Sequence, residues 1–284
     1  MIDDKPSQTA IMALVSRALD ARLAPERRIC QDEFARYFLT NRSTLLGETW
    51  IPEPLVRFYH RARYPGVSAY VMVRTRFFDD VALQAARNGA MQIVDLGAGY
   101  DTRFYRYKNE FAGVCLFEVD FPATQRRKRE LLQRVPGFPF ENVRFVPVDF
   151  MKESLPEKLA GAGFDPTAKT LFLWEGVSYY VDAVVVDAVL KFVRDGSGPG
   201  SSLVFDTVPP FIVEYTRRHK PSINAAEPLL WGIEPETIPA FLRERGFDCA
   251  EHHLASELGE KYCVGKVKRR YVAPWYSLIL AAVR

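Results

Sequence analysis

The chain has few of the residues that build disulfide frameworks or zinc sites. It holds four cysteines, scattered and without a CxxC pair. Its four histidines form no zinc signature, so no metal is expected. Scattered free thiols are typical of a reducing compartment, which favours a cytoplasmic protein.

Long apolar runs and an excess of charge of one sign are also missing. The best candidate for a membrane span is interrupted by Glu175 and Asp182, and the first residues carry the acids Asp3 and Asp4 where a signal peptide would be hydrophobic. The 38 Lys and Arg residues nearly balance the 35 Asp and Glu residues. We therefore expect neither a nucleic-acid partner nor a membrane partner.

What is present is a chain of 284 residues, 48% apolar, which is long enough to bury a full core. The first part predicts helical segments over residues 7–39, with a break at Ala24-Pro25, and a helix over 67–88. After residue 89, short apolar strands alternate with helices, which is typical of an α/β protein with a parallel sheet covered on both faces. The predicted strands are residues 92–96, 114–117, 143–148, 170–174 and 202–206, with helices at 122–134 and 182–194. Two further strands, 262–264 and 275–282, are expected to add an antiparallel strand at the edge of the sheet.

This pattern predicts an N-terminal helical cap over residues 1–88 and a Rossmann-like core over residues 89–284. A Pro-rich stretch, 208–233, is expected to be a lid inserted into the core. Its basic run includes His219. This histidine would be a general base if the protein is an enzyme, or else part of a solvated helix face. If the cap and the lid together cover a substrate pocket, deleting residues 1–40 is expected to abolish catalytic turnover while leaving some affinity for a cofactor bound at the core.

A glycine turn, Gly97-Ala98-Gly99, follows the first predicted strand. Glycines at this point let the backbone pass close to a ligand and turn sharply into a helix. A dinucleotide fingerprint has a third glycine where this chain has Thr102, beside Asp101. An acid at that place repels a diphosphate and suits a ligand that carries an ammonium group.

Acidic residues follow the next strands as each one ends. Asp120, or alternatively Glu118, is placed to accept hydrogen bonds from ribose hydroxyls. Asp149 would accept from an adenine amino group, with Phe150 packed on the base, and Glu175 ends the fourth strand. Open parallel sheets bind ligands at the carboxyl ends of their strands. The ordered series describes a nucleoside with a charged amino-acid tail, S-adenosylmethionine.

In these motifs the chain resembles the leucine carboxyl methyltransferase-like family of class I methyltransferases, in its bacterial small-molecule branch. The resemblance rests on residues 7–10, 17–18, 74–80, 96–106, 118–122, 175–180, 232–235 and 241–247. It implies a class I methyltransferase fold, S-adenosylmethionine as the cofactor, and O-methylation of an acidic or aromatic small molecule of polyketide type. A carboxylate acceptor is ionised at neutral pH and needs no base, whereas a phenol has to lose a proton first.

The resemblance also implies roles for single residues. Arg74 is expected to pair with the methionine carboxylate of the cofactor, and Gly97 to contact its methionine portion. Glu175 would lie near the methionine ammonium group, and Tyr180 near the acceptor. Arg76, two residues further along the same helix, is expected to face elsewhere.

The chain departs from the family's leucine-carboxyl branch at two positions. Gln8 stands where that branch has a basic residue, and Met151 stands where it has an arginine. Both departures argue against a protein-phosphatase substrate. Two other functions stay open from the sequence: an NAD(P)-dependent oxidoreductase, if Thr102 tolerates a pyrophosphate, and a non-catalytic cofactor-binding scaffold.

Overall fold

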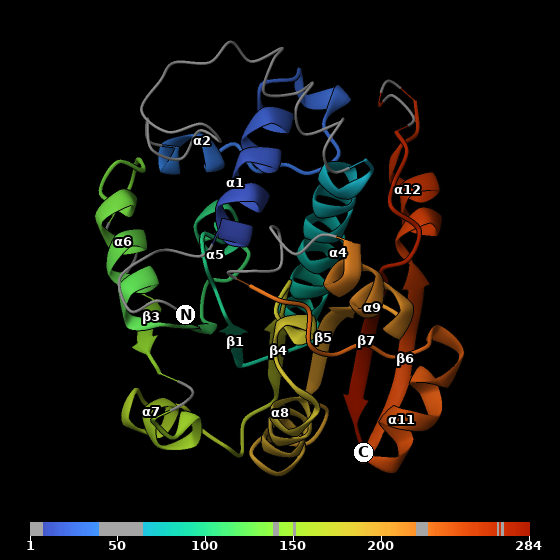
Figure 1. Cartoon of the computed structure of the whole chain (residues 1–284). Coiled ribbons are helices and arrows are strands. Elements are labelled where there is room, and N and C mark those ends of the chain that lie inside the picture. The colour runs from blue at the N-terminus through green and yellow to red at the C-terminus, as the bar shows by residue number, and fades with distance from the viewer. Residues whose placement is uncertain are drawn as a thin grey trace.

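The computed structural model describes residues 8–39, 65–138, 142–149, 152–219, 227–265, 267 and 270–284. Its described strands form one sheet in the order β3-β2-β1-β4-β5-β7-β6 (Figure 1). The strands are β1 (Gln92–Leu96), β2 (Cys115–Asp120), β3 (Val143–Pro147), β4 (Thr170–Trp174), β5 (Ser202–Thr207), β6 (Phe247–Leu254) and β7 (Ser277–Val283). β1 to β5 are parallel, and β7 runs antiparallel to both β5 and β6. The predicted α/β class, a mostly parallel Rossmann-like sheet, is confirmed.

Helices precede the sheet and fill the connections between its strands. They are α1 (Gln8–Ala21), α2 (Ala35–Phe38), α4 (Val67–Arg87), α5 (Arg103–Arg106), α6 (Pro122–Leu132), α7 (Leu155–Gly161), α8 (Ala183–Asp195), α9 (Pro210–His219), α11 (Ile238–Glu244) and α12 (Ala255–Tyr262), with single 3-10 turns η1 (Pro25–Arg27), η3 (Ser178–Tyr180) and η4 (Pro235–Thr237). Local chemistry sets several ends. Asp182 caps α8 by accepting the N–H of Val185 at 3.0 Å. α4 ends at Arg87 and is capped by Asn88, which is followed by Gly89 at a φ of +80°.

Two buried clusters cover the two faces of the sheet. Ile93 and Leu171 belong to the first cluster, with side chains of α1, α2, α4 and α12. Their chain neighbours Val94 and Phe172 belong to the second, with side chains of α7, α8 and α11. Successive side chains of a strand point to opposite faces, so each apolar strand contributes to both clusters. Figure 1 shows the two groups of helices on opposite sides of the sheet.

The prediction for the end of the chain was partly wrong. Residues 262–264 are not a strand: Tyr262 ends α12 and a loop follows. The strand that pairs with β7 at the edge of the sheet is β6, whose side chains are mostly half-buried or exposed. A strand with so few buried side chains lacks the continuous apolar run that identified the central strands.

The predicted break at Ala24-Pro25 is confirmed, because α1 ends at Ala21, η1 begins at Pro25, and α2 follows from Ala35. The Pro-rich stretch 208–233 contains a helix, α9, and an extended segment after residue 227. That segment is tied to the sheet end through the N–H of Leu230, which donates to the carbonyl of Tyr179 at 2.8 Å. The division into cap, core and lid stays a prediction. None of the helices in the described ranges is both long and apolar enough to cross a membrane.

Candidate functional site

The glycine turn leads directly out of β1 and lies against β2. The N–H groups of Gly97 and Ala98 both donate to the carbonyl of Val119, at 2.8 and 3.0 Å. Gly97 has a φ of +82°, and a Cβ there would lie 2.6 Å from Cγ2 of Val177. Both facts require glycine at this position.

Asp120 ends β2 beside this turn. Its Oδ2 accepts the N–H of Gly99 at 2.5 Å, and its Oδ1 accepts the N–H of Phe121 at 2.6 Å. Burial raises the pKa of Asp120, and these two N–H groups partly oppose the rise. The glycine turn and the carboxylate of Asp120, both predicted to contact the same ligand, are thus hydrogen-bonded to each other.

Asp101 follows the turn and is held by Arg103. Its Oδ1 accepts the N–H of Arg103 at 2.6 Å, and its Oδ2 lies 3.0 Å from Nη2 of the same residue. Burial alone would raise the pKa of Asp101, but the guanidinium of Arg103, aided by Arg17 and Lys128, lowers it to about 2. Asp101 is therefore an anion beside the glycine turn at neutral pH.

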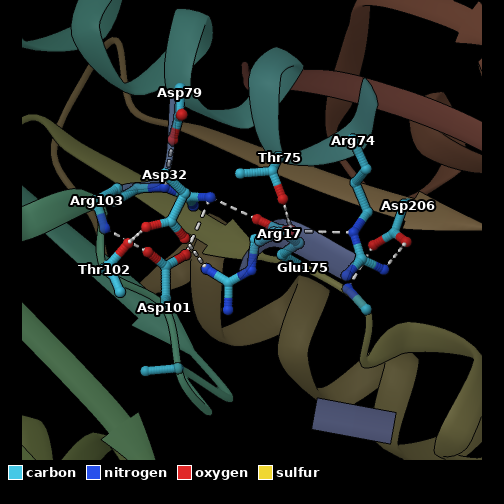
Figure 2. Close-up of polar contacts among 12 residues, drawn as sticks. Arg17, Asp32, Arg74, Thr75, Asp79, Asp101, Thr102, Arg103, Glu175 and Asp206 are labelled. Atoms are coloured by element: carbon cyan, nitrogen blue, oxygen red, sulfur yellow. Dashed lines mark hydrogen bonds and ion pairs between the residues drawn. The ribbon is translucent and has the colours of Figure 1, made fainter. Parts of the chain in front are cut away.

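Glu175, just after β4, joins two guanidinium groups. Its Oε1 accepts from Nε of Arg74 at 3.0 Å, and its Oε2 pairs with Nη2 of Arg103 at 2.5 Å. Thr75 adds a hydroxyl 3.3 Å from Oε1. Burial would raise the pKa of Glu175, but the two arginines lower it. Figure 2 shows Glu175 between the arginines, with dashed lines to Arg74 and Thr75.

Arg74 comes from α4 and is also bonded to the end of β5. Its Nη1 lies 3.1 Å from both Oδ2 of Asp206 and the hydroxyl of Tyr179. Asp206 is fully buried, and it also accepts the N–H of Gly176 at 2.6 Å and the hydroxyl of Tyr70. Among the described residues, no hydrogen bond is made by Nη2 of Arg74.

The predicted adenine contacts are described only in part. Asp149 follows β3, its side chain is 18% exposed, and its Oδ2 lies 3.2 Å from Nζ of Lys152. Phe150 lies outside the described residues. Arg76 faces away from the site, as expected: it pairs with Asp80 at 3.0 Å, and its guanidinium lies over the ring of Tyr262.

The two predicted acceptor-side residues lie in different surroundings. Tyr180 is half-buried in η3, 4.7 Å from the ring of Tyr179. His219 is exposed at the end of α9, where its ring stacks on Tyr215 and its Nδ1 lies 3.2 Å from the carbonyl of that residue. The structure brings Tyr180 to the sheet end, whereas the contacts of His219 are with its own helix.

Sequence reasoning missed several side chains of the site. Asp206 lies near the end of the fifth strand, β5, so the rule that selected Asp120 and Glu175 also applies to it. Arg103 lies within the glycine-loop motif but had no role assigned. Asp95 is buried on β1, and its Oδ2 has no hydrogen-bond partner among the described residues.

Comparison with known proteins identifies the family. Residues 10–194 match the family described as leucine carboxyl methyltransferase. The chain belongs to this family. A protein of Mycolicibacterium gilvum named "Putative S-adenosyl-L-methionine-dependent methyltransferase" is 41% identical over 137 residues, which are 48% of this chain and 44% of that protein. A protein of Mycobacterium tuberculosis with the same name is 31% identical over 212 residues, 72% of this chain and 66% of that protein. The chain therefore covers less than two thirds of the length of these relatives.

Comparison with solved structures supports the fold. The crystal structure of a "putative methyltransferase" from Thermobifida fusca superposes on this chain with a TM-score of 0.58 at 17% identity. The superposition covers 95% of this chain and 94% of that one. At that identity the likeness concerns the fold alone. The match of residues 10–194 to the family confirms the resemblance, and S-adenosylmethionine as cofactor is confirmed at the level of the family.

The residues of this leucine carboxyl methyltransferase family member fit a ligand with cationic groups. Within the described part of the polar network, carboxyl groups outnumber cations. The carboxyl groups are Asp32, Asp79, Asp95, Asp101, Glu118, Glu175 and Asp206, and the cations are Arg17, Arg74, Arg103, Arg106 and Lys128. The orphaned Oδ2 of Asp95 adds an acceptor without a donor. The described ranges contain no group of three or more His, Cys, Asp or Glu residues that could hold a metal ion.

Proposed function

We propose that this protein transfers a methyl group from S-adenosylmethionine to an oxygen of a small-molecule acceptor, either a carboxylate or an acidic phenol of an aromatic, polyketide-type metabolite. Family membership supports the cofactor and the reaction class. The family's name refers to methylation of a carboxyl group, which favours an oxygen acceptor.

The observation that carries the proposal is the charge beside the glycine turn. Asp101 is held as an anion there, with a pKa of about 2, at the beginning of α5. A dinucleotide places its diphosphate over such a turn and against a helix N-terminus. Here α5 has only four residues and begins next to an anion, which repels a diphosphate and attracts the ammonium and sulfonium of S-adenosylmethionine.

The chain's own residues would divide the binding of this ligand among them. Asp120 would accept from the ribose hydroxyls, and Nη2 of Arg74 would donate to the methionine carboxylate. Glu175 and Asp101 would face the ammonium group, with Gly97-Ala98-Gly99 below it. Asp149 and Phe150 would contact the adenine. When bound, the cofactor supplies a methyl group already activated by the sulfonium.

The acceptor side is a group of tyrosines near Arg74. The rings of Tyr70 and Tyr276 stack 3.5 Å apart, and Tyr179 lies 6.2 Å from Tyr276. Such rings suit a flat aromatic acceptor. Burial raises the pKa of Tyr180, so its hydroxyl keeps its proton at neutral pH and donates a hydrogen bond to the acceptor oxygen. These residues would orient an acceptor and exclude water, which accounts for much of the rate of such a displacement. A base at His219 would be needed only for a phenol.

Calorimetric titration tests the cofactor. S-adenosylhomocysteine is expected to bind and NADH is not. Binding of NADH alone would instead favour an oxidoreductase.

A panel of aromatic acids and phenols, incubated with S-adenosylmethionine labelled in its methyl group, tests the acceptor. A labelled product that mild base hydrolyses is an ester and identifies a carboxylate acceptor, whereas a stable product is an ether. Binding of S-adenosylhomocysteine without transfer to any member of the panel would favour a non-catalytic scaffold.

A further inference from the structure

The N-terminal segment meets the glycine loop in a buried polar contact between residues far apart in the sequence. Nη2 of Arg17, on α1, donates to the carbonyl of Tyr100 at 2.8 Å, and its Nη1 pairs with Oδ2 of Asp32 at 2.6 Å. Oδ1 of Asp32 accepts the hydroxyl of Thr102 at 2.6 Å. Both charged side chains are more than nine-tenths buried. Arg17, Asp32 and Thr102 are drawn together in Figure 2.

The rest of the surroundings fixes Asp32 in this place. Its Oδ1 also accepts the N–H of Ala35 at 3.0 Å, at the start of α2. Nε of Arg106 lies 3.6 Å from the same oxygen and donates to the hydroxyl of Thr102 at 2.9 Å. The contact therefore has a defined geometry on both sides, in which α1 and α2 hold one end and α5 holds the other.

The residue between the two anchored positions is Asp101. Its N–H donates to the carbonyl of Ala98 at 2.8 Å, so the sheet side of the loop is fixed by the glycine turn. The carbonyl of Tyr100 and the side chain of Thr102 are fixed by Arg17 and Asp32. We propose that Arg17 and Asp32 are positioning residues for the cofactor: they hold Tyr100 and Thr102, and thereby set where the Asp101 carboxylate lies. The inference rests on the proposed function, since it concerns the same site.

The chain offers a matched control on α1, the helix that carries Arg17. Asp20 is as buried as Asp32, at 1% and 0% exposure. Its Oδ2 accepts the N–H groups of Ile29 and Cys30 at 2.8 and 3.1 Å, and its Oδ1 pairs with Arg270 at 3.1 Å. None of these contacts reaches the glycine loop. Loss of either carboxylate costs stability, but only Asp32 would affect the loop.

The test compares Asp32→Asn with Asp20→Asn in the full chain. The dissociation constant of S-adenosylhomocysteine is measured by calorimetry well below the melting temperature of each variant, and Tm is measured in parallel. We expect Asp32→Asn to weaken binding tenfold or more, and Asp20→Asn to change it less than twofold while lowering Tm to a similar extent. Equal effects on affinity, or an unchanged affinity in folded Asp32→Asn, would overturn the inference.

Thr102→Val serves if Asp32→Asn does not fold. It keeps the pair of Arg17 and Asp32 and the bond from Arg17 to the carbonyl of Tyr100, but removes the hydroxyl that donates to Asp32. We expect it to weaken binding threefold or more. Wild-type affinity in Thr102→Val would refute the positioning role. Failure of the wild-type protein to bind S-adenosylhomocysteine would refute the proposed function itself, so the two failures can be told apart.

Discussion

The carboxylate of Asp120 accepts the backbone N–H of Gly99 at 2.5 Å. This bond links the end of β2 to the turn after β1, at the first crossover of the sheet. The carboxylate is therefore oriented before any ligand arrives. A preoriented acceptor loses little entropy on binding, which favours affinity.

Replacing Asp120 tests the ribose contact. We expect Asp120→Ala to weaken binding of S-adenosylhomocysteine by about 1–3 kcal/mol, because charge-assisted hydrogen bonds to the ligand are lost. Calorimetry measures the change. The control is Asp187→Ala, which removes a half-exposed acid of α8 on the other side of the sheet and is expected to leave affinity unchanged. An unchanged affinity in Asp120→Ala would place the ribose contact elsewhere.

Arg74 is expected to matter for stability as well as for binding. Arg74→Leu leaves the buried carboxylate of Asp206 without its cation and takes one of two from Glu175. Breaking a buried pair in this way costs about 3–5 kcal/mol of unfolding free energy. Urea denaturation measures the loss.

The matched control is Arg76→Leu on the same helix. Its pair with Asp80 is 37% and 42% exposed, so we expect a change below about 1 kcal/mol. Equal losses in the two variants would contradict the account of the buried network. Arg74→Lys keeps the charge but not the planar fork, and we expect it to recover part of the stability and little of the cofactor affinity.

The sequence predicts those parts of the fold that depend on local patterns. β1 and β4 coincide with the predicted strands 92–96 and 170–174, because strands buried on both faces consist mostly of apolar side chains. The acids at the strand ends were also found, because parallel strands bring their carboxyl ends to one edge of the sheet. Asp206 follows the same rule, and a consistent reading would have included it.

The contacts of Arg17 and Asp32 with the glycine loop could not be predicted from the sequence. Arg17 and Tyr100 are 83 positions apart, and no periodicity connects them. This contact also changes one expectation. If Arg17 and Asp32 position the loop, deletion of residues 1–40 lowers affinity for the cofactor as well as turnover.

Glu227 is expected to stabilise the N-terminus of α1. Its Oε2 accepts both the N–H of Thr9, at 3.0 Å, and the hydroxyl of that residue. A carboxylate at a helix N-terminus is favourable because of the helix dipole. We expect Glu227→Gln to speed hydrogen exchange of the amides in the first turns of α1 and to cost about 0.5–1.5 kcal/mol. Mass spectrometry of the exchanged peptides measures the first effect. Glu234→Gln, at an exposed position, is the control, and identical exchange in the two variants would contradict this role.

The last prediction concerns the pH dependence of stability and the buried carboxyl of Asp95. Burial, together with Asp101, raises its pKa well above 3.8, although Arg103 and Lys128 oppose the rise. A folded protein with a raised carboxyl pKa binds more protons than the unfolded chain between the two pKa values. The stability contributed by the protonated group is therefore present at acid pH and is lost as the pH rises through the folded pKa.

Asp95→Asn removes this titration and nearly keeps the shape of the side chain. We expect the variant and the wild-type protein to have similar unfolding free energies near pH 4, and the variant to be more stable by about 1–3 kcal/mol at pH 7.5, because the raised pKa disfavours ionisation of the buried wild-type carboxyl, whose Oδ2 has no hydrogen-bond partner among the described residues. Urea denaturation without ligand at a series of pH values measures the difference, which isolates Asp95 from other buried acids such as Asp79 and Glu118. A difference that falls as the pH rises would show that Asp95 is ionised and stabilised by Arg103 and Lys128. A difference that is constant with pH would show that its pKa is the same in the folded and unfolded states, and either result would contradict the prediction.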